Sequence, residues 1–238
     1  MKEELKILAI ILARGGSKGL PKKNIKIFCD KPLISWTISQ ALKSNAFEDV
    51  VVSTDCSEIS KISKESGAYV PFLRPKELAQ DTSSSIDAII HSIDYLSEIG
   101  KDYDAVCLLE PTSPIRTPGQ LKSIVEDYKK KCHQYTSVIT VGKIREPLEL
   151  FKVLDGDALK PLKSSTHSQS RRQDMNDYYF PYGVAYIANT INLREEKTLY
   201  TSKCSYYVIE DNQCFEIDGQ IDFDINEYLF QKYYYNKQ

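Results

Sequence analysis

Basic residues and glycines gather in one segment near the start of the chain. Between Arg14 and Phe28 lie five basic residues and three glycines, with no acidic residue among them. Glycines let backbone N–H groups approach an anion closely, and a loop after a buried strand lies at the sheet edge where open α/β folds bind ligands. The segment therefore favours a triphosphate site over the alternative of a solvated basic turn. Its cations are Arg14, Lys18, Lys22, Lys23 and Lys26, and the glycines nearest the strand are Gly15 and Gly16.

This segment matches neither of two common phosphate-binding motifs. Its glycines do not form GxGxxG, and no GK[ST] sequence ends it. These mismatches argue against a dinucleotide-binding fold and against a P-loop.

Two carboxylates alternate in a short segment near the end of the chain. Glu216 and Asp218 lie two residues apart in a stretch that we expect to be a strand, so both side chains should point to the same face. Two hard oxygens on one face suit Mg²⁺, which keeps several waters and also binds substrate phosphates. The alternative is a solvent-facing edge strand followed by a helix that Asp222 or Asp224 caps.

A third polar segment, residues 108–117, follows another buried apolar run. Two prolines restrict its loop, and Thr112, Ser113 and Arg116 offer hydrogen-bond donors to an anionic or hydroxyl-rich ligand. The alternative is a rigid turn in which Thr117 caps the next helix.

The elements that position these segments alternate between strand and helix patterns. Apolar runs typical of strands buried on both faces are followed by stretches with helical apolar periodicity. Repeated units of this kind predict right-handed crossovers and a mostly parallel, doubly wound sheet. We expect strands at residues 6–13, 50–54, 105–109, 137–141 and 183–188, and helices at residues 32–44, 57–66 and 224–234. Two further helices should begin at a Ser85 cap and at a Thr117 cap, the second with Gln120 completing a capping box.

The pattern changes between residues 142 and 182. Asp155-Gly156 lies between two short apolar stretches and predicts a hairpin. Residues 163–177 are polar and weakly periodic. We expect residues 142–182 to form an excursion from a single domain of residues 1–238, either as a flexible loop or as an arm that packs on a second subunit.

Composition excludes several classes of protein. Hydrophobic residues make up 42% and charged residues 27%, which is ordinary for a soluble globular protein, and the formal net charge of −2 provides no basic field for nucleic acid. The six cysteines form no CxxC pair, which favours free thiols in a reducing compartment. The apolar run at residues 7–13 is too short to span a membrane and lacks the features of a signal peptide. We therefore expect a cytoplasmic protein with no membrane or nucleic-acid partner.

Several ordered motifs together resemble one enzyme family. The chain is similar, nearly end to end, to the CMP-sialic acid synthetases (acylneuraminate cytidylyltransferases), which include the enzymes for legionaminic and pseudaminic acids. The motifs are LARGGSKGLPKKN (12–24), VVSTD (51–55), FLRPKELAQDTSSS (72–85), LLEPTSPIRT (108–117), RRQD followed by PYGVAYI (171–187) and FEIDGQID (215–222).

The resemblance implies a three-layer Rossmann-like sheet of the nucleotide-diphospho-sugar transferase type and a homodimer in which the excursion reaches the partner. It also implies roles for single residues. Arg14, Ser17, Lys18, Lys23 and Asn24 would hold the CTP phosphates, while Arg74 and Ser85 would contact the base. Arg172 would hold the acidic sugar, and Glu216 and Asp218 would bind the metal. Arg14, Lys23 and Asp218 would thus be catalytic, and Asp55 would either approach the nucleotide or cap a helix.

Three positions depart from the pattern of this family. Its members commonly carry Gln where Glu110 stands, Asn where Tyr182 stands and Asp where Glu216 stands. Glu110 and Tyr182 lie where the sugar should bind. The Glu110 carboxylate must be paired, protonated or given a positive ligand group. The candidate partners are Arg116, Arg172 and a donor on the sugar such as an extra amine or hydroxyl.

The activity implied is that of a cytidylyltransferase. The anomeric hydroxyl of an acidic eight- or nine-carbon ulosonic sugar would attack the α-phosphorus of CTP and expel pyrophosphate, with Mg²⁺ and the basic loop neutralising charge. No residue stands out as general base. The alternatives are a glycosyltransferase on a related fold and a nucleotide-binding paralogue without turnover.

Overall fold

A six-stranded sheet forms the centre of the molecule. The computed structural model describes residues 5–162 and 176–235. The strands are ordered β10-β6-β9-β5-β1-β4, and β9 is antiparallel to both of its neighbours while the other pairs are parallel. The expectation of a mostly parallel sheet is confirmed, but the reversed direction of β9 was not predicted. These strands are β1 (Ile7–Leu12), β4 (Asp49–Ser53), β5 (Ala105–Leu108), β6 (Ser137–Lys143), β9 (Tyr179–Asn189) and β10 (Cys204–Val208).

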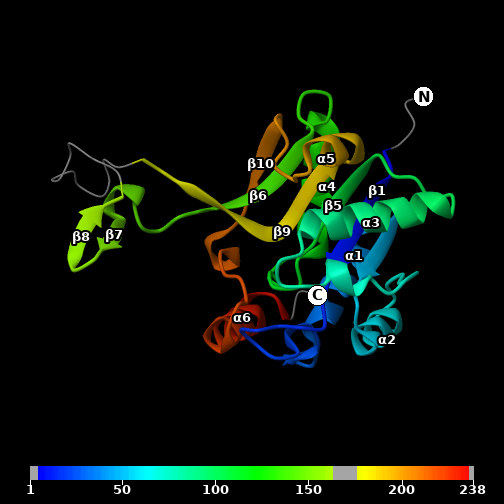
Figure 1. Cartoon of the computed structure of the whole chain (residues 1–238), viewed down its shortest axis with the longest axis horizontal. Helices are drawn as coiled ribbons and strands as arrows, with labels where there is room; N and C mark the ends of the chain where they lie inside the picture. Colours follow the sequence, from blue (N-terminus) through cyan, green and yellow to red (C-terminus); the bar gives the residue numbers. More distant parts are fainter. Residues whose placement is uncertain (1–4, 163–175, 236–238) are drawn as a thin grey trace.

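Helices cover both faces of this sheet, which gives three layers (Figure 1). Alternate residues of β1 contact opposite layers, because successive side chains of a strand point to opposite faces. Ile7, Ala9 and Ile11 pack with α1, α2 and α4, whereas Leu8 and Ile10 pack with α3 and α5. The helices are α1 (Leu33–Ser44), α2 (Ser57–Glu65), α3 (Ser85–Glu98), α4 (Pro118–Lys131), α5 (Thr190–Glu196) and α6 (Gln220–Tyr233).

A third apolar cluster joins the two ends of the chain. Leu20 and Phe28 follow β1, and they pack with Ile217 and with Phe223 and Phe230 of α6. Figure 1 shows α6 beside the blue segment that follows β1. This packing places residues 216–218 next to the basic loop, although about two hundred residues of sequence separate them.

The excursion projects from the sheet as a long arm (Figure 1). Its stalk continues β6 and β9, which pair from Val141 with Pro181 to Lys143 with Tyr179. The predicted hairpin is confirmed at its end, where β7 (Lys152–Asp155) pairs with β8 (Ala158–Pro161) around Gly156, whose φ is 57°. A two-stranded ribbon of β2 (Ile27–Phe28) and β3 (Lys31–Pro32) completes the strands.

Three local predictions are wrong. Ser84, not Ser85, caps α3, since its side chain accepts a hydrogen bond from the Ile86 N–H. Thr117 does cap α4, but the Gln120 side chain bonds the Gln213 side chain in place of a capping box. Residues 214–218 do not form a strand. Among the described residues, no helix is long and apolar enough to cross a membrane.

Candidate active site

A cavity of about 340 Å³ opens at the carboxyl ends of β1 and β5. A larger hollow of about 950 Å³ lies at the opposite edge, beside the first residues of β1, and contains none of the predicted site residues. Parallel sheets bind ligands at their carboxyl ends, so the smaller cavity is the candidate site. Its lining includes seven predicted residues: Arg14, Lys23, Asn24, Arg74, Ser85, Glu110 and Thr112.

Hydrogen bonds hold the basic loop in place. The Gly15 N–H donates to Asp55 Oδ1 at 2.8 Å, and Asn24 Nδ2 donates to the Arg14 carbonyl at 3.2 Å. Asp55 therefore supports the loop, while Cys56 is the residue at the N-terminal cap of α2. The predicted residues Gly15, Gly16, Ser17 and Lys18 lie in this loop but outside the lining of the cavity.

An acidic residue that we did not assign meets the basic loop. Asp81 lines the cavity, and its carboxylate lies 2.8 Å from Arg14 Nη2 and 2.6 Å from Lys18 Nζ. The hydrogen bond from Lys18, together with the charges of Lys18 and Arg14, lowers the pKa of Asp81. The acid in LAQDTSSS was visible in the sequence, but nothing local showed that it faces cations about sixty residues away.

Replacing Asp81 with asparagine should tighten the binding of a triphosphate about two- to fivefold. The carboxylate competes with phosphates for Arg14 and Lys18, and exposed ion pairs are weak, so the effect should be modest. Calorimetric titration with CTP measures it. Weaker binding by the variant would mean that Asp81 positions Arg14 and does not compete with the ligand.

Arg74 and Ser85 lie together on the side of the cavity formed by residues 74–85. The Arg74 side chain is buried, and its backbone N–H donates to the Thr54 carbonyl at 2.7 Å. Burial lowers the pKa of Arg74, while the charge of Asp55 opposes that effect. Ser85 is exposed at the start of α3.

Lys23 connects the basic loop to the carboxylate segment. Its Nζ donates to the Ile217 carbonyl at 2.6 Å and lies 3.7 Å from Asp218 Oδ1. A Cβ on Gly19 would clash with the Asp218 carbonyl oxygen, so only glycine allows this close approach. The structure thus brings a cation of the cavity wall next to a carboxylate from the opposite end of the chain, although neither Glu216 nor Asp218 lines the cavity.

Glu216 and Asp218 have different surroundings. Glu216 Oε1 accepts from the Gly183 N–H at 2.6 Å and from Ser113 Oγ at 3.2 Å. The Asp218 side chain is 88% exposed and faces Lys23. The segment is irregular, so the prediction that both carboxylates point to one face of a strand is wrong. Within residues 5–162 and 176–235, no cluster of three or more His, Cys, Asp or Glu side chains is arranged to hold a metal.

Two residues predicted to bind the sugar are buried. Arg116 is fully buried, and its guanidinium donates to the carbonyls of Val184 (2.6 Å) and Glu110, while burial lowers its pKa to about 10. Ser113 is 2% exposed and holds Glu216. Both predictions are corrected: Arg116 and Ser113 support the walls of the site and do not face the cavity.

Replacing Arg116 with methionine should lower the free energy of unfolding by about 2–4 kcal/mol, because the buried carbonyls of residues 110 and 184 each lose a hydrogen bond from the guanidinium. Urea unfolding of the two proteins measures this loss. An unchanged stability would contradict the structural role. Lys122→Met, on the following helix, removes a charge at an exposed position and serves as the control.

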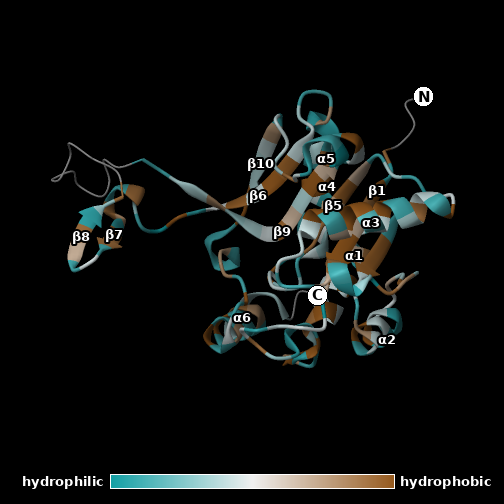
Figure 2. Ribbon diagram, in the orientation of Figure 1, coloured by the Kyte–Doolittle hydropathy of each residue, from teal (hydrophilic) through white to brown (hydrophobic). Residues whose placement is uncertain are grey.

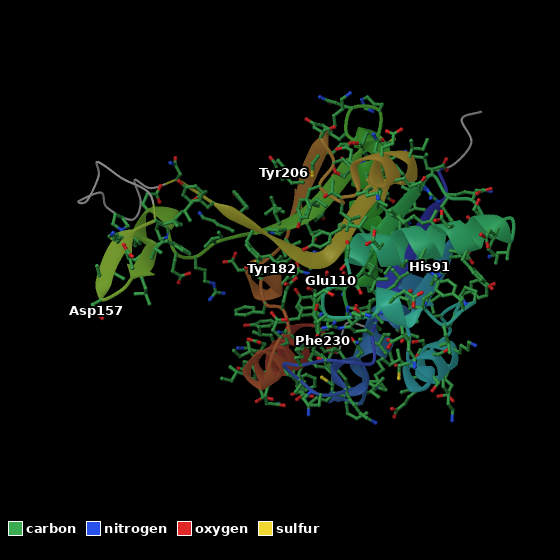
Figure 3. The ribbon with its side chains drawn as sticks, viewed as in Figure 1. His91, Glu110, Asp157, Tyr182, Tyr206 and Phe230 are labelled. Atoms are coloured by element: carbon green, nitrogen blue, oxygen red, sulfur yellow. The ribbon has the colours of Figure 1, made fainter. Side chains whose placement is uncertain are left out.

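Tyr182 lies beside the site without lining the cavity. Its carbonyl accepts from Thr140 Oγ1 at 2.6 Å, and its ring packs edge-on against Phe180. Burial raises the pKa of Tyr182. Figure 3 shows Tyr182 where the arm meets the body, near Glu110. Arg172 lies outside the described residues.

Comparison with known proteins shows the protein family to which the chain belongs. A family model described as cytidylyltransferase matches residues 8–238. Pseudaminic acid cytidylyltransferase from Campylobacter jejuni (strain 81-176) is 32% identical, over 95% of this chain and 97% of that protein. CMP-N,N'-diacetyllegionaminic acid synthase from Legionella pneumophila is 34% identical over the same shares of the two chains. N-acylneuraminate cytidylyltransferase from Escherichia coli is 34% identical, and the chain spans only 52% of its length.

Solved structures support the fold. CMP:2-keto-3-deoxy-manno-octonic acid synthetase in complex with CTP superposes with a TM-score of 0.70 at 15% identity, over 95% of this chain and 99% of that one. A cytidylyltransferase from Leptospira borgpetersenii gives a TM-score of 0.63 at 17% identity, over 97% and 88%. The three-layer Rossmann-like architecture is therefore confirmed.

Proposed function

The chain belongs to the cytidylyltransferase family, and on this basis we propose that it transfers CMP from CTP to the anomeric hydroxyl of an acidic eight- or nine-carbon ulosonic sugar, releasing pyrophosphate. One observation supports this most directly. Lys23 lines the cavity and also reaches Ile217 and Asp218, so it links the cations suited to a triphosphate with the carboxylate segment, which lies next to the lining of the cavity and not in it. Relatives that act on sialic-type sugars match nearly the whole chain.

Two groups of residues would bind CTP, one at the phosphates and one at the nucleoside. Arg14, Lys18 and Lys23 would bind the phosphates, and Arg74 and Ser85 would contact the nucleoside. The sugar hydroxyl would lose its proton to a water molecule held by Asp218, and its oxygen would attack the α-phosphorus. The bond to the β-phosphate would break, and pyrophosphate would leave with its charge neutralised by the basic loop. Cations that are already oriented stabilise this developing charge without reorganisation during the reaction.

The carboxylates suit a divalent cation. Glu216 Oε1 is held by two donors, which leaves Oε2 to bind, and the Asp218 carboxylate is exposed. Two carboxylates with substrate phosphates and waters make up the ligand set that Mg²⁺ prefers. We propose that Glu216 and Asp218 hold Mg²⁺. A bound Mg²⁺ would polarise the phosphate and the attacking hydroxyl.

The assay that tests this function measures pyrophosphate release with CTP, Mg²⁺ and a panel of eight- and nine-carbon ulosonic acids. We expect release with CTP and at least one acid, and little with ATP, GTP or UTP. Release with none of the acids would contradict the proposal and favour a paralogue without turnover. Transfer from a nucleotide-sugar to a second acceptor would favour a glycosyltransferase.

The arm supports a homodimer. Leu154 and Leu159 pair across the hairpin, and their side chains are 79% and 66% exposed. Figure 2 shows hydrophobic residues on β7 and β8, although these strands lie away from the sheet. Because exposed apolar surface of this kind marks an interaction site, we propose that the arm of a single domain packs on a second subunit.

The double variant Leu154→Asp, Leu159→Asp should be monomeric at micromolar concentration, since two buried charges at the interface would oppose association. Sedimentation velocity measures the change. Ile191→Asp, an exposed apolar position on α5, is the control and should stay dimeric. A double variant that remains a dimer would place the interface elsewhere.

The chemistry of the cysteines supports a cytosolic location. All six cysteines are free, which is usual in a reducing compartment. We propose that the enzyme works in the cytosol.

A further inference from the structure

Hydrogen bonds of its backbone groups fix Glu110 at the wall of the cavity. It follows β5, its N–H donates to the Gly183 carbonyl at 3.1 Å, and its own carbonyl accepts from Arg116. The side chain lies flat against Gly183, where an added Cβ would come within 2.6 Å of Glu110 Oε2. The carboxylate therefore has a defined position among the residues that line the cavity.

Among residues 5–162 and 176–235, this carboxylate has one long hydrogen bond. Its hydrogen-bond donor in the structure is Thr112 Oγ1, at 3.3 Å from Oε2. Burial raises the pKa of Glu110, while Thr112 and the positive charges of Arg116 and Lys23 act in the opposite direction. A ligand that brings a positive charge would stabilise the ionised carboxylate.

A carboxylate at this wall suits the acceptor better than the nucleotide. Phosphates would be repelled by Glu110, whereas Arg14, Lys18 and Lys23 attract them toward the basic loop. A carboxylate accepts hydrogen bonds but donates none, so it disfavours acyl oxygens and carboxylates on a sugar and favours N–H groups. A cationic nitrogen satisfies both the hydrogen bond and the charge.

We propose that Glu110 selects an acceptor sugar that carries a cationic nitrogen, as an ammonium or amidinium group, at the position facing its carboxylate. This inference rests on the proposed function, because it assigns the part of the cavity beside Glu110 to the acidic sugar. The sugar would thus be zwitterionic. Its own carboxylate must lie away from Glu110.

The test compares nine-carbon ulosonic acids in matched pairs, one with a free amine and one with the same amine acetylated. At saturating CTP and Mg²⁺, kcat/KM of the unmodified enzyme should be about tenfold or more higher for an amine form, as expected for a charge-assisted contact. In Glu110→Gln, the ratio of kcat/KM for the amine form to kcat/KM for the acetylated form should fall close to one. The KM for CTP should stay within about twofold of that of the unmodified enzyme. Glu110→Asp, which keeps the charge, should retain the preference. Glu65→Gln, an equal change of charge on α2, is the control.

The outcomes separate this inference from the proposed function. If the enzyme uses the acetylated forms equally well or better, the selection by Glu110 is wrong while the CMP transfer stands. If Glu110→Gln keeps the preference for the amine form, the proposed selection by Glu110 is also wrong. If no ulosonic acid of either form releases pyrophosphate, both proposals fail. If Glu110→Gln does not fold, the amine preference of the unmodified enzyme and of Glu110→Asp tests the proposal. Absence of the preference in either protein would contradict it.

Discussion

Replacing Lys23 with alanine should lower kcat/KM for CTP by about 10- to 100-fold, because a charge-assisted hydrogen bond contributes about 1.5–3 kcal/mol. The effect should exceed that of any other cation in the basic loop. Lys23 faces the cavity and also binds the Ile217 carbonyl, so its loss removes a phosphate contact and loosens the carboxylate segment. Steady-state kinetics with varied CTP measure the change.

The matched control is Lys22→Ala. Lys22 belongs to the same loop and carries the same charge, but its Nζ lies 3.0 Å from Glu58 on the surface of α2. Its kinetics should stay within about twofold of the unmodified enzyme. If Lys23→Ala retains normal kinetics and only melts at a lower temperature, Lys23 has a structural role and the assignment of the phosphate site is wrong.

Replacing Asp218 with asparagine should lower turnover by about 100-fold or more at ordinary Mg²⁺ concentrations, with the fold intact. Even groups that only support metal ligands typically contribute 10- to 100-fold, and Asp218 is proposed as a direct ligand. Its side chain is 88% exposed, so the substitution disturbs no packing. Turnover measured over a range of Mg²⁺ concentrations tests the role in metal binding, and a circular dichroism spectrum tests whether the fold is intact.

Asp224→Asn provides the comparison for this variant. Asp224 is also an exposed carboxylate close in sequence, but it accepts from Gln220 Nε2 at 2.6 Å within α6. Its turnover should be nearly normal. Near-normal activity of Asp218→Asn at saturating Mg²⁺ would remove Asp218 from the metal site.

Most of the central sheet was predictable, because strand and helix patterns depend on residues that are close in sequence. The apolar runs at residues 6–13, 50–54, 105–109, 137–141 and 183–188 correspond to β1, β4, β5, β6 and part of β9. Strand β10 was missed. It lies at the edge of the sheet, and Tyr206 and Val208 are exposed there, so the segment lacks a continuous buried run.

The kinds of side chain in the candidate site were predictable from the sequence, but their arrangement in space was not. The basic loop and residues 216–218 were recognised from residue types, and the structure brings them into contact through Lys23. Their contact depends on packing of Leu20 against Ile217, which no local pattern encodes. Arg116 was misjudged for the same reason. A cation in a polar loop suggests a ligand contact, but here the buried carbonyls of residues 110 and 184 required a donor.

The sequence by itself determined the fold class, the cytidylyltransferase resemblance and the kinds of groups available for catalysis, since these follow from periodicity and from ordered motifs along the chain. Only the tertiary structure decided which groups meet. It reversed β9, paired Asp81 with Arg14 and Lys18, buried Arg116 and set Glu110 beside Glu216. The physical reason is that burial and charge pairing depend on distances in space, which are established only when segments far apart in sequence pack together.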